Sequence, residues 1–173
     1  MARQQHIIAI SLLLLSTAFA FVNGVEESSY LESEENKVDV VVEGMVYCQS
    51  CKHYGTWSLT GAKPLPSAKV SVTCRDHKNR VSLYKVFPTN EKGYFYGQLD
   101  GFKMDQHILD HPLHACVVRL LSSSDSNCSN ISNINYGIDG APLRYENKRL
   151  FGKKYEAVVY SAGPLAFRPS HCY

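Results

Sequence analysis

Short stretches of this sequence alternate between hydrophobic and polar residues, with the period of a β-strand. Residues 68–74 (AKVSVTC) place Ala, Val, Val and Cys on one face and Lys, Ser and Thr on the other. Residues 81–87 (VSLYKVF) alternate in the same way after a polar turn. The two stretches therefore predict a β-hairpin with one buried face.

Other apolar stretches of strand length follow the same logic. In residues 38–47, Val40, Val42, Gly44 and Val46 share a face, and a glycine in mid-strand indicates a bulge or the close approach of another backbone. No stretch has the period of a long amphipathic helix. We expect further strands at residues 94–99, 116–121 and 154–161, an edge segment at 165–168, and either a short strand or a loop at 54–59.

About seven short strands separated by turns are typical of an all-β fold. We therefore predict an antiparallel β-sandwich or β-barrel over residues 38–173. The segment 100–113 resembles a loop with one helical turn, and residues 122–135 form a polar loop rich in serine and asparagine.

The first 24 residues have the pattern of a cleaved signal peptide. Arg3 precedes an apolar run at residues 7–15, which is too short to span a bilayer, and Ala18-Phe19-Ala20 is a cleavage signal of small residues. Cleavage is expected after residue 20 or after residue 24. A membrane anchor is the alternative, but no second hydrophobic stretch or stop-transfer pattern follows. We expect a secreted protein.

Charge is distributed unevenly along the chain. Residues 25–37 are acidic and lack apolar periodicity, which predicts a disordered leader. From residue 36 onward, 17 Lys and Arg oppose 11 Asp and Glu, a net charge of about +6, whereas the whole chain carries +2. This basic part of the chain, called the basic body below, would suit an acidic partner. A solvated basic face that binds no partner is equally compatible with the charge.

All six cysteines follow the signal peptide, and an even count in a secreted chain predicts three disulfides. The Cys48-x-x-Cys51 pair is compatible with a redox centre, half of a zinc site, or two anchors for separate disulfides. The pair ends a predicted strand instead of beginning a helix, and no second close pair exists, so structural disulfides are favoured. Spacing alone leaves their pairing open.

Two glycosylation sequons lie side by side, at Asn127 and Asn130. Their close spacing disfavours double occupancy. A glycan on Asn127 would also compete with disulfide formation at Cys128, so Asn130 is the favoured site.

The sequence offers little that resembles catalytic chemistry. His107, His111 and His114 would suit a metal site or a pH-sensitive patch, but Pro112 interrupts any helix that would align them, and solvated loop histidines are favoured. Motifs for a nucleophile with its base, for a zinc protease and for a phosphate loop are missing. We predict no catalytic residues, no bound metal, no cofactor, and a protein that is not an enzyme.

Several stretches of the sequence resemble motifs of a known protein family. Residues 42–51 (VEGMVYCQSC) resemble the V-x-G-x-V-Y-C-x-x-C opening of the pollen Ole e 1 allergen and extensin family of plants. Residues 68–74, 91–95 and 116–120 resemble its later strands and turn. Residues 160–172 (YSAGPLAFRPSHC) are similar to the end of the PAC domain of proline-rich and arabinogalactan cell-wall proteins. The resemblance covers roughly residues 38–173 and includes the six cysteines.

The resemblance implies an antiparallel β-fold and extracellular location, including the cell wall. The family's disulfide pattern implies the pairs Cys48–Cys128, Cys51–Cys172 and Cys74–Cys116. A short chain of this kind also resembles seed and root hair protective proteins. The family's proline-rich members carry a hydroxyproline-rich segment where this chain has the acidic leader, so extensin-type O-glycosylation is not expected.

The resemblance and the basic body together predict a cell-wall protein that binds acidic or galactan-type polysaccharide and supports the wall in growing cells such as root hairs. Other wall glycoproteins are further candidate partners; nucleic acid and membrane are not. The alternative is a secreted protein-binding or signalling module, including a protease inhibitor, of pollen or root type. The candidate polysaccharide-binding residues are Lys69, Lys85, Tyr94, Tyr96, Arg144, Lys148, Arg149, Lys153 and Lys154.

Overall fold

The structure is a computed structural model that describes residues 38–102, 108–153 and 155–172. The chain divides into two compact units, Met1–Glu35 and Asn36–Tyr173, and the described residues all lie in the second. The predicted signal peptide at residues 1–24 and the predicted leader at residues 25–37 lie outside the described residues. None of the helices in the described ranges is long and apolar enough to cross a membrane.

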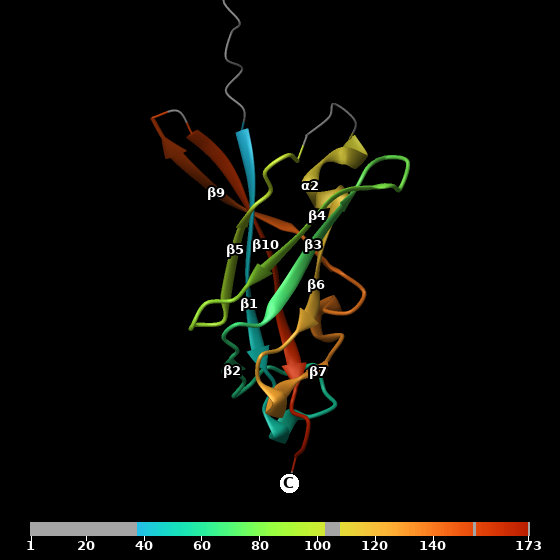
Figure 1. Cartoon of the computed structure of the whole chain (residues 1–173), viewed down its shortest axis with the longest axis vertical. Helices are drawn as coiled ribbons and strands as arrows, with labels where there is room; N and C mark the ends of the chain where they lie inside the picture. Colours follow the sequence, from blue (N-terminus) through green and yellow to red (C-terminus); the bar gives the residue numbers. More distant parts are fainter. Residues whose placement is uncertain (1–37, 103–107, 154, 173) are drawn as a thin grey trace, which may run out of the picture. The chain divides into compact units, whose positions relative to one another are not determined.

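The described residues form two β-sheets connected by short helical turns (Figure 1). The six-stranded sheet contains β1 (Val38–Cys48), β2 (Lys63–Pro64), β5 (Tyr94–Gln98), β7 (Asn130–Ile131), β9 (Arg144–Gly152) and β10 (Tyr155–Arg168). The four-stranded sheet contains β3 (Lys69–Arg75), β4 (Val81–Pro88), β6 (Cys116–Ser122) and β8 (Ala141–Pro142). The helical turns are η1 (Cys51–His53), η2 (Ile108–Asp110), α2 (Pro112–Ala115), η3 (Ser126–Cys128) and η4 (Ile134–Tyr136).

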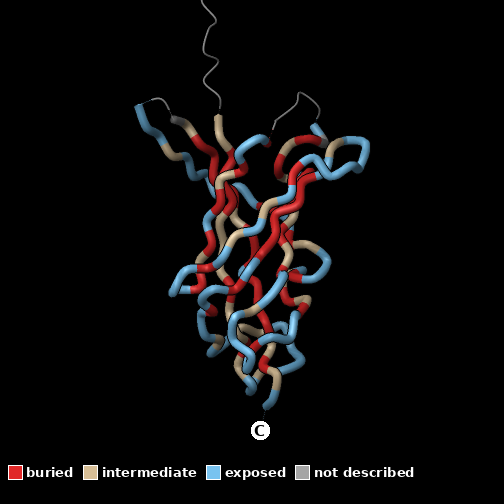
Figure 2. The backbone as a smooth tube through the Cα atoms, in the orientation of Figure 1, coloured by how far each residue is buried: buried red, intermediate tan, exposed pale blue. Residues whose placement is uncertain are grey.

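The predicted all-β fold class is confirmed, and the predicted hairpin of β3 with β4 is present. The described strands do not close into a barrel, so the two-sheet sandwich is the better description. The main core contains apolar side chains of both sheets, among them Val42 of β1, Val70 and Val72 of β3, and Phe167 of β10, each with no exposed surface. Figure 2 shows the buried stretches of the backbone in the middle of the domain. Burial of this apolar surface is the main force that holds the two sheets together.

One strand pair differs from the antiparallel arrangement that we predicted. β1 and β10 run parallel, from Val38 beside Glu156 to Cys48 beside Phe167, and Figure 1 shows them side by side. The other strand pairs of the described residues are antiparallel. Parallel strands are usually buried on both faces and contain continuous apolar runs, as β1 does at residues 40–42.

Burial on both faces is visible in the contacts of those three valines. Val40 and Val42 contribute to the main core. Val41 faces the other way and packs against Ala157, Val159 and Leu150 in a second, smaller cluster. The six-stranded sheet therefore has an apolar patch on its outer face as well as its inner one.

The close approach predicted at Gly44 is confirmed. A Cβ atom at this position would lie 2.4 Å from the backbone oxygen of Ala162 and 2.7 Å from the ring of Phe95. The register of β1 with β10 also shifts between Gly44 and Val46. Only a residue without a side chain allows β10 and the Phe95 ring to pack this tightly against β1.

Three disulfides connect distant parts of the domain, and they are the pairs that the family resemblance implies. Cys74–Cys116 joins directly opposite positions of β3 and β6. Cys48–Cys128 and Cys51–Cys172 attach the end of β1 to residues 80 and 121 positions away. No described cysteine is free, so Cys48 and Cys51 form neither a redox pair nor a zinc site. In the chain-entropy model each bond stabilises the fold by on the order of 3–5 kcal/mol.

Several strands of the structure were not predicted from the sequence or were predicted too short. β9 was not predicted, because most of its residues are exposed and its sequence, RYENKRLFG, has no apolar alternation. β10 continues from Tyr155 to Arg168 as one strand, where we predicted a strand and a separate edge segment. Residues 54–59 are a loop, one of the two predicted alternatives. The two-residue strands β2, β7 and β8 carry no sequence signal.

We expect the substitution Gly44→Ala to lower the free energy of unfolding by about 3 kcal/mol, because the added methyl group overlaps backbone and a buried ring. Chemical denaturation measures the change. Gly101→Ala is the matched control: open space surrounds Gly101, so only its φ of +86° is unfavourable, and we expect a loss of about 1 kcal/mol. Equal losses in the two variants would contradict the packing argument.

Candidate functional site

The outer face of the six-stranded sheet brings together four of the predicted polysaccharide-binding residues. Strands β5, β1, β10 and β9 are neighbours in that order, and register places Tyr96, Glu43, Ser161 and Arg144 side by side across them. Side chains at paired positions lie on the same face of a sheet. Tyr94 on β5 and Lys148 on β9 both donate hydrogen bonds to the carboxylate of Glu43. We call this set the Glu43 face: Glu43, Tyr94, Tyr96, Arg144, Lys148 and Ser161.

Glu43 is the centre of a tight hydrogen-bond cluster. Its side chain is only 13% exposed. The Tyr94 hydroxyl donates to Oε2 over 2.6 Å, and the Lys148 ammonium donates to Oε1 over 3.0 Å and to Oε2 over 2.8 Å. The ammonium therefore neutralises the carboxylate, and two side chains from different strands are held in fixed positions.

The protonation states of this cluster follow from the contacts. Burial disfavours the charged form of Glu43, but the hydrogen bonds from Lys148 and Tyr94, with the lysine charge, lower the pKa of its carboxyl below the ordinary value of 4.5. Burial, followed by the hydrogen bond to Glu43 and the charge of that carboxylate, raises the pKa of Tyr94. At neutral pH the carboxylate is ionised and the phenol is protonated, so acceptor and donor are fixed.

A shallow depression of about 270 Å³ lies on the Glu43 face. Its lining includes Glu43, Tyr94, Arg144, Ser161 and Tyr47. The Arg144 guanidinium donates to the carbonyl of Gly163 over 2.7 Å and forms no ion pair with a described carboxylate. The depression thus offers hydroxyl groups, a carboxylate and a guanidinium, which can hydrogen-bond to sugar hydroxyls, and aromatic rings, which can pack against the C–H face of a sugar.

The other predicted residues lie elsewhere, so they do not form one basic face. Arg149 pairs with Glu156 over 2.6 Å and lines a different depression, beside Val158 and Tyr160. Lys85, on the four-stranded sheet, pairs with Asp100 over 2.9 Å. Lys69 lies at the start of β3 and Lys153 lies in the turn after β9, and both are exposed. Lys154 lies outside the described residues.

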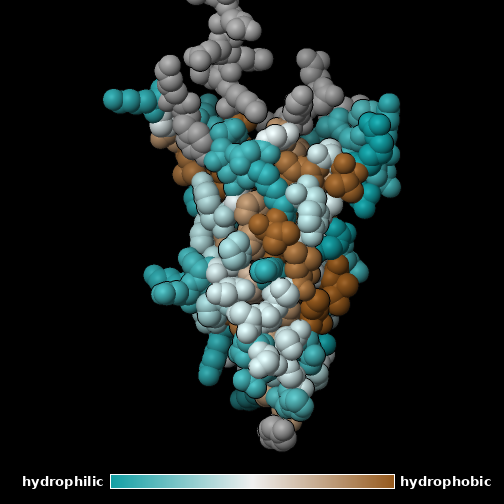
Figure 3. All heavy atoms as spheres, viewed as in Figure 1, coloured by the Kyte–Doolittle hydropathy of each residue, from teal (hydrophilic) through white to brown (hydrophobic). Residues whose placement is uncertain are grey.

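The molecular face in Figure 3 also lacks a single continuous polar surface. Hydrophobic side chains interrupt the hydrophilic ones across it, and no continuous hydrophilic surface covers it. Four of the described Lys and Arg residues, namely Arg80, Lys85, Lys148 and Arg149, are paired with carboxylates.

The histidines weighed as an alternative metal site in the sequence do not come together as one in the described part of the chain. His111 caps α2, where its Nδ1 accepts a hydrogen bond from the backbone N–H of Leu113 over 3.3 Å. His114 lines another depression, and His107 lies outside the described residues. The described His, Cys, Asp and Glu residues contain no group of three or more that would hold a metal ion.

The depression beside His114 contains cations that the sequence reasoning missed. Its volume is about 300 Å³, and its lining includes Arg75, His77, His114 and Arg119. Arg75 donates to the carbonyl of Asn79 over 2.9 Å, and Arg119 donates to that of Asp139 over 2.6 Å. The implied Cys74–Cys116 bond gave no signal for this grouping, because β3 and β6 are antiparallel and Arg119 pairs with Ser71, four residues before Arg75.

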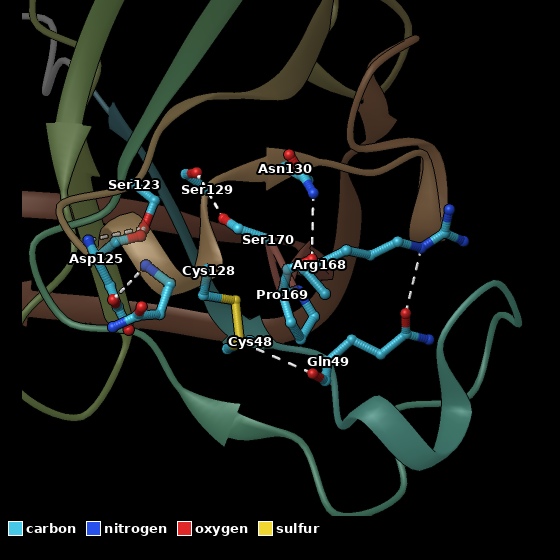
Figure 4. Close-up of a disulfide and its surroundings, with 12 residues drawn as sticks. Cys48, Gln49, Ser123, Asp125, Cys128, Ser129, Asn130, Arg168, Pro169 and Ser170 are labelled. Atoms are coloured by element: carbon cyan, nitrogen blue, oxygen red, sulfur yellow. Dashed lines mark hydrogen bonds between the residues drawn. A yellow bond between two sulfur atoms is a disulfide. The ribbon is translucent and has the colours of Figure 1, made fainter. Parts of the chain in front are cut away.

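Both predicted glycosylation sites are exposed, and Asn127 is the neighbour of Cys128 in the chain. Figure 4 shows Asn130 near the Cys48–Cys128 disulfide. Asn127 lies in η3, and Asn130 begins β7. The amide nitrogen of Asn130 donates to the Pro169 carbonyl over 3.1 Å. Occupancy of either asparagine remains a prediction.

The two sheets and three disulfides define a cross-linked all-β domain with a polar, aromatic depression on one face. No family model matches the chain. It is 32% identical over 139 residues to non-classical arabinogalactan protein 30 of Arabidopsis thaliana, covering 78% of this chain and 55% of that protein. It is also 32% identical over 104 residues to a pistil-specific extensin-like protein of Nicotiana tabacum, covering 60% of this chain and 22% of that protein.

A solved structure supports the fold. The crystal structure of the major plantain pollen allergen superposes with a TM-score of 0.53 at 23% identity, covering 79% of this chain and 98% of that chain. The family resemblance is confirmed: the homologues of this chain are plant arabinogalactan, proline-rich or extensin-like, and Ole e 1-like pollen proteins. These relatives are not named as enzymes. The chain spans about half the length of the arabinogalactan protein, 55%, and less of the extensin-like one.

The lowered pKa of Glu43 predicts a specific acid sensitivity. A carboxyl whose pKa is lower in the folded state stabilises the fold above about pH 4.5 and loses that contribution as the pH falls through the folded-state pKa. We expect Glu43→Gln to be less stable than the wild type by about 1–2 kcal/mol at neutral pH. The difference should shrink below about pH 4.5. Thermal or urea unfolding across pH measures both effects.

Asp76, whose pKa its contacts with Arg80 lower to about 2, also titrates in acid. It is present in both proteins, so the difference between their curves isolates Glu43. Glu146→Gln, on an exposed position of β9, is the matched control and should follow the wild-type curve. A stability difference between Glu43→Gln and the wild type that stays constant down to pH 3 or so would contradict the assignment.

Proposed function

We propose that this chain is a secreted, non-enzymatic protein of the plant cell wall that binds wall polysaccharide through the Glu43 face. The observation that carries the proposal is that Tyr94 and Arg144 line one depression, while Tyr96 and Lys148 lie on the same face of the sheet. The names of the homologues, arabinogalactan and extensin-like proteins, support the wall assignment. Secretion rests on the predicted signal peptide and agrees with three disulfides.

The charges of the face favour a neutral galactan over an acidic polysaccharide. Glu43 neutralises Lys148, which leaves Arg144 as the cation of this face without a described carboxylate partner. A galactan chain brings hydroxyl groups for the guanidinium, the carboxylate and the Ser161 hydroxyl. The exposed ring of Tyr96, 43% accessible, offers a flat surface beside them.

The other parts of the proposal concern the protein in its tissue. An N-glycan at Asn130, contacts with other wall glycoproteins, and a role in supporting the walls of growing cells such as root hairs complete the proposed function. The disulfides suit such a setting, because they keep a small domain folded in an oxidising medium.

A second candidate is a secreted protein-binding or signalling module, including a protease inhibitor. The depression lined by Arg75, His77, His114 and Arg119 favours it, because two guanidinium groups there are bonded to neutral carbonyls, and the Asp76 carboxylate in the same lining is paired with Arg80. These guanidinium groups would attract an anionic partner. Loss of binding to a protein partner on substitution of Arg75 and Arg119, with polysaccharide binding unchanged, would support this candidate.

Affinity chromatography on immobilised β-1,4-galactan tests the proposed function. We expect the wild type to be retained, and Tyr96→Ala and Arg144→Ala each to weaken retention by about tenfold, since each removes a group that faces the ligand. Lys69→Ala is the matched control, because Lys69 is exposed on the other sheet, and its retention should equal that of the wild type.

Salt discriminates between the two kinds of polysaccharide. Binding to neutral galactan should change little as the ionic strength rises, whereas binding to polygalacturonate through exposed cations should weaken strongly. A wild-type protein that passes through both galactan and polygalacturonate columns without delay would refute the proposal.

A further inference from the structure

Three aromatic side chains are exposed together at the end of the domain that carries two disulfides. Trp57 is 60% exposed, Tyr136 53% and Tyr54 48%. The rings of Trp57 and Tyr136 meet edge to face, with centroids 6.2 Å apart and planes at 74°. The Arg168 guanidinium lies over the ring of Tyr54, 5.7 Å from its centroid. Tyr54 and Trp57 lie on one loop, and Tyr136 comes from a segment distant in sequence, so the fold brings Trp57 and Tyr136 into contact.

The loop that carries Trp57 is held by a buried side chain. Gln49, only 1% exposed, donates through Nε2 to the carbonyls of Thr56 and Ser58, over 3.0 and 2.9 Å. Its Oε1 accepts a hydrogen bond from Nε of Arg168 over 3.2 Å, as Figure 4 shows. A buried amide with all these partners satisfied is a strong local constraint. Trp57 therefore stands on an anchored loop between Cys51 and β2.

The loop that carries Tyr136 is held in an unusual backbone conformation. Asn135 and Tyr136 have φ values of 51° and 66°, a left-handed region that side-chain-bearing residues rarely adopt. The Asn135 amide donates to the carbonyl of Pro164 over 2.7 Å, and the Tyr136 carbonyl accepts from the N–H of Gly140 over 2.7 Å. Such backbone outliers persist where surrounding contacts over-determine them and are enriched at binding sites.

We propose that Trp57, Tyr136 and Tyr54 form a stacking platform for the pyranose rings of a neutral polysaccharide chain. The C–H groups on one face of a galactopyranose ring pack against an indole or phenol face, and covering Trp57 removes apolar surface from water. Thr56, Ser58 and Thr60 place hydroxyl groups on the same loop. The Ser58 hydroxyl donates to that of Thr60, and the Thr56 hydroxyl donates to the His53 carbonyl, and these bonds can be exchanged for bonds to sugar hydroxyls.

The charges around the platform suit a neutral ligand. Arg168 is already bonded to Gln49 and Thr56 and stacked on Tyr54, so its charge is committed to holding the site together. Next to Trp57 the loop offers the neutral hydroxyl groups of Thr56, Ser58 and Thr60, and its basic residues, Lys52 and His53, lie at its start in η1. The inference rests on the proposed function for the class of ligand, but it assigns a surface distinct from the Glu43 face.

The chain itself supplies the probe, because Trp57 is its only tryptophan. Titration of the mature protein with β-1,4-galactotetraose should change the intensity and wavelength of its tryptophan emission in a saturable manner. Trp57→Ala and Tyr136→Ala should each weaken binding to immobilised galactan by about tenfold, whereas Trp57→Phe, which keeps a ring, should lose less. Tyr84→Ala is the matched control, since Tyr84 is 56% exposed on β4, and should bind as the wild type does.

The outcomes separate this inference from the proposed function. Retention of the wild type on galactan with unchanged Trp57 emission, and equal retention of Trp57→Ala, would overturn the platform and leave the Glu43 face standing. An emission response that survives Arg144→Ala would support the platform independently of that face. Failure of the wild type both to bind and to respond would overturn both. Concentration-dependent self-association that Trp57→Ala abolishes would assign the rings to a second copy of the chain and overturn the platform.

Discussion

The parallel pairing of β1 with β10 is the interaction on which the rest of this domain depends. It extends from Val38 to Cys48 along β1, and β5 and β9 are hydrogen-bonded to its two outer sides. Its central valines are buried on both faces, in the main core and in the outer cluster. Because parallel strands need a long connection, the chain between them supplies the whole four-stranded sheet that covers the inner face.

The same pairing positions both candidate surfaces. Glu43, in the middle of β1, receives Tyr94 from one neighbouring strand and Lys148 from beyond the other, so its carboxylate ties β5 to β9 across the sheet. Gln49, just past the end of β1, holds the Trp57 loop and binds Arg168 at the end of β10. One strand pair thus supports a polar depression on its outer face and an aromatic platform at its end.

Much of the fold was predicted from the sequence. The alternation of β3 and β4, the glycine contact at Gly44 and the all-β class follow from local patterns. The family resemblance supplied the disulfide pairs, which spacing had left open. The antiparallel assignment was wrong for β1 and β10, although their continuous apolar runs are the signal of strands buried on both faces. β9 had no apolar signal to find.

The sequence likewise identified some residues of the candidate sites and not others. Sequence named Tyr94, Tyr96, Arg144 and Lys148 by residue type, but it also named Lys69, Lys85 and Arg149, which the fold places elsewhere. It overlooked Glu43, because one acidic residue in a run of valines looks like an exposed position of a strand. It could not find Gln49, whose importance comes from burial and from two backbone partners on one loop, 7 and 9 residues further along the chain.

The sequence by itself determined the apolar faces, the turns, the six cysteines and the choice of residue types, because these depend on chemistry carried by neighbouring positions. Only the tertiary structure decided which strands run parallel, which cations are neutralised and which rings reach solvent together. Those outcomes depend on contacts between residues far apart in the chain. Residues 38–51 illustrate both kinds of information. Their pattern predicts a strand that ends in two cysteines, whereas the parallel pairing with β10 and the positions of the two disulfide-linked segments follow from the fold.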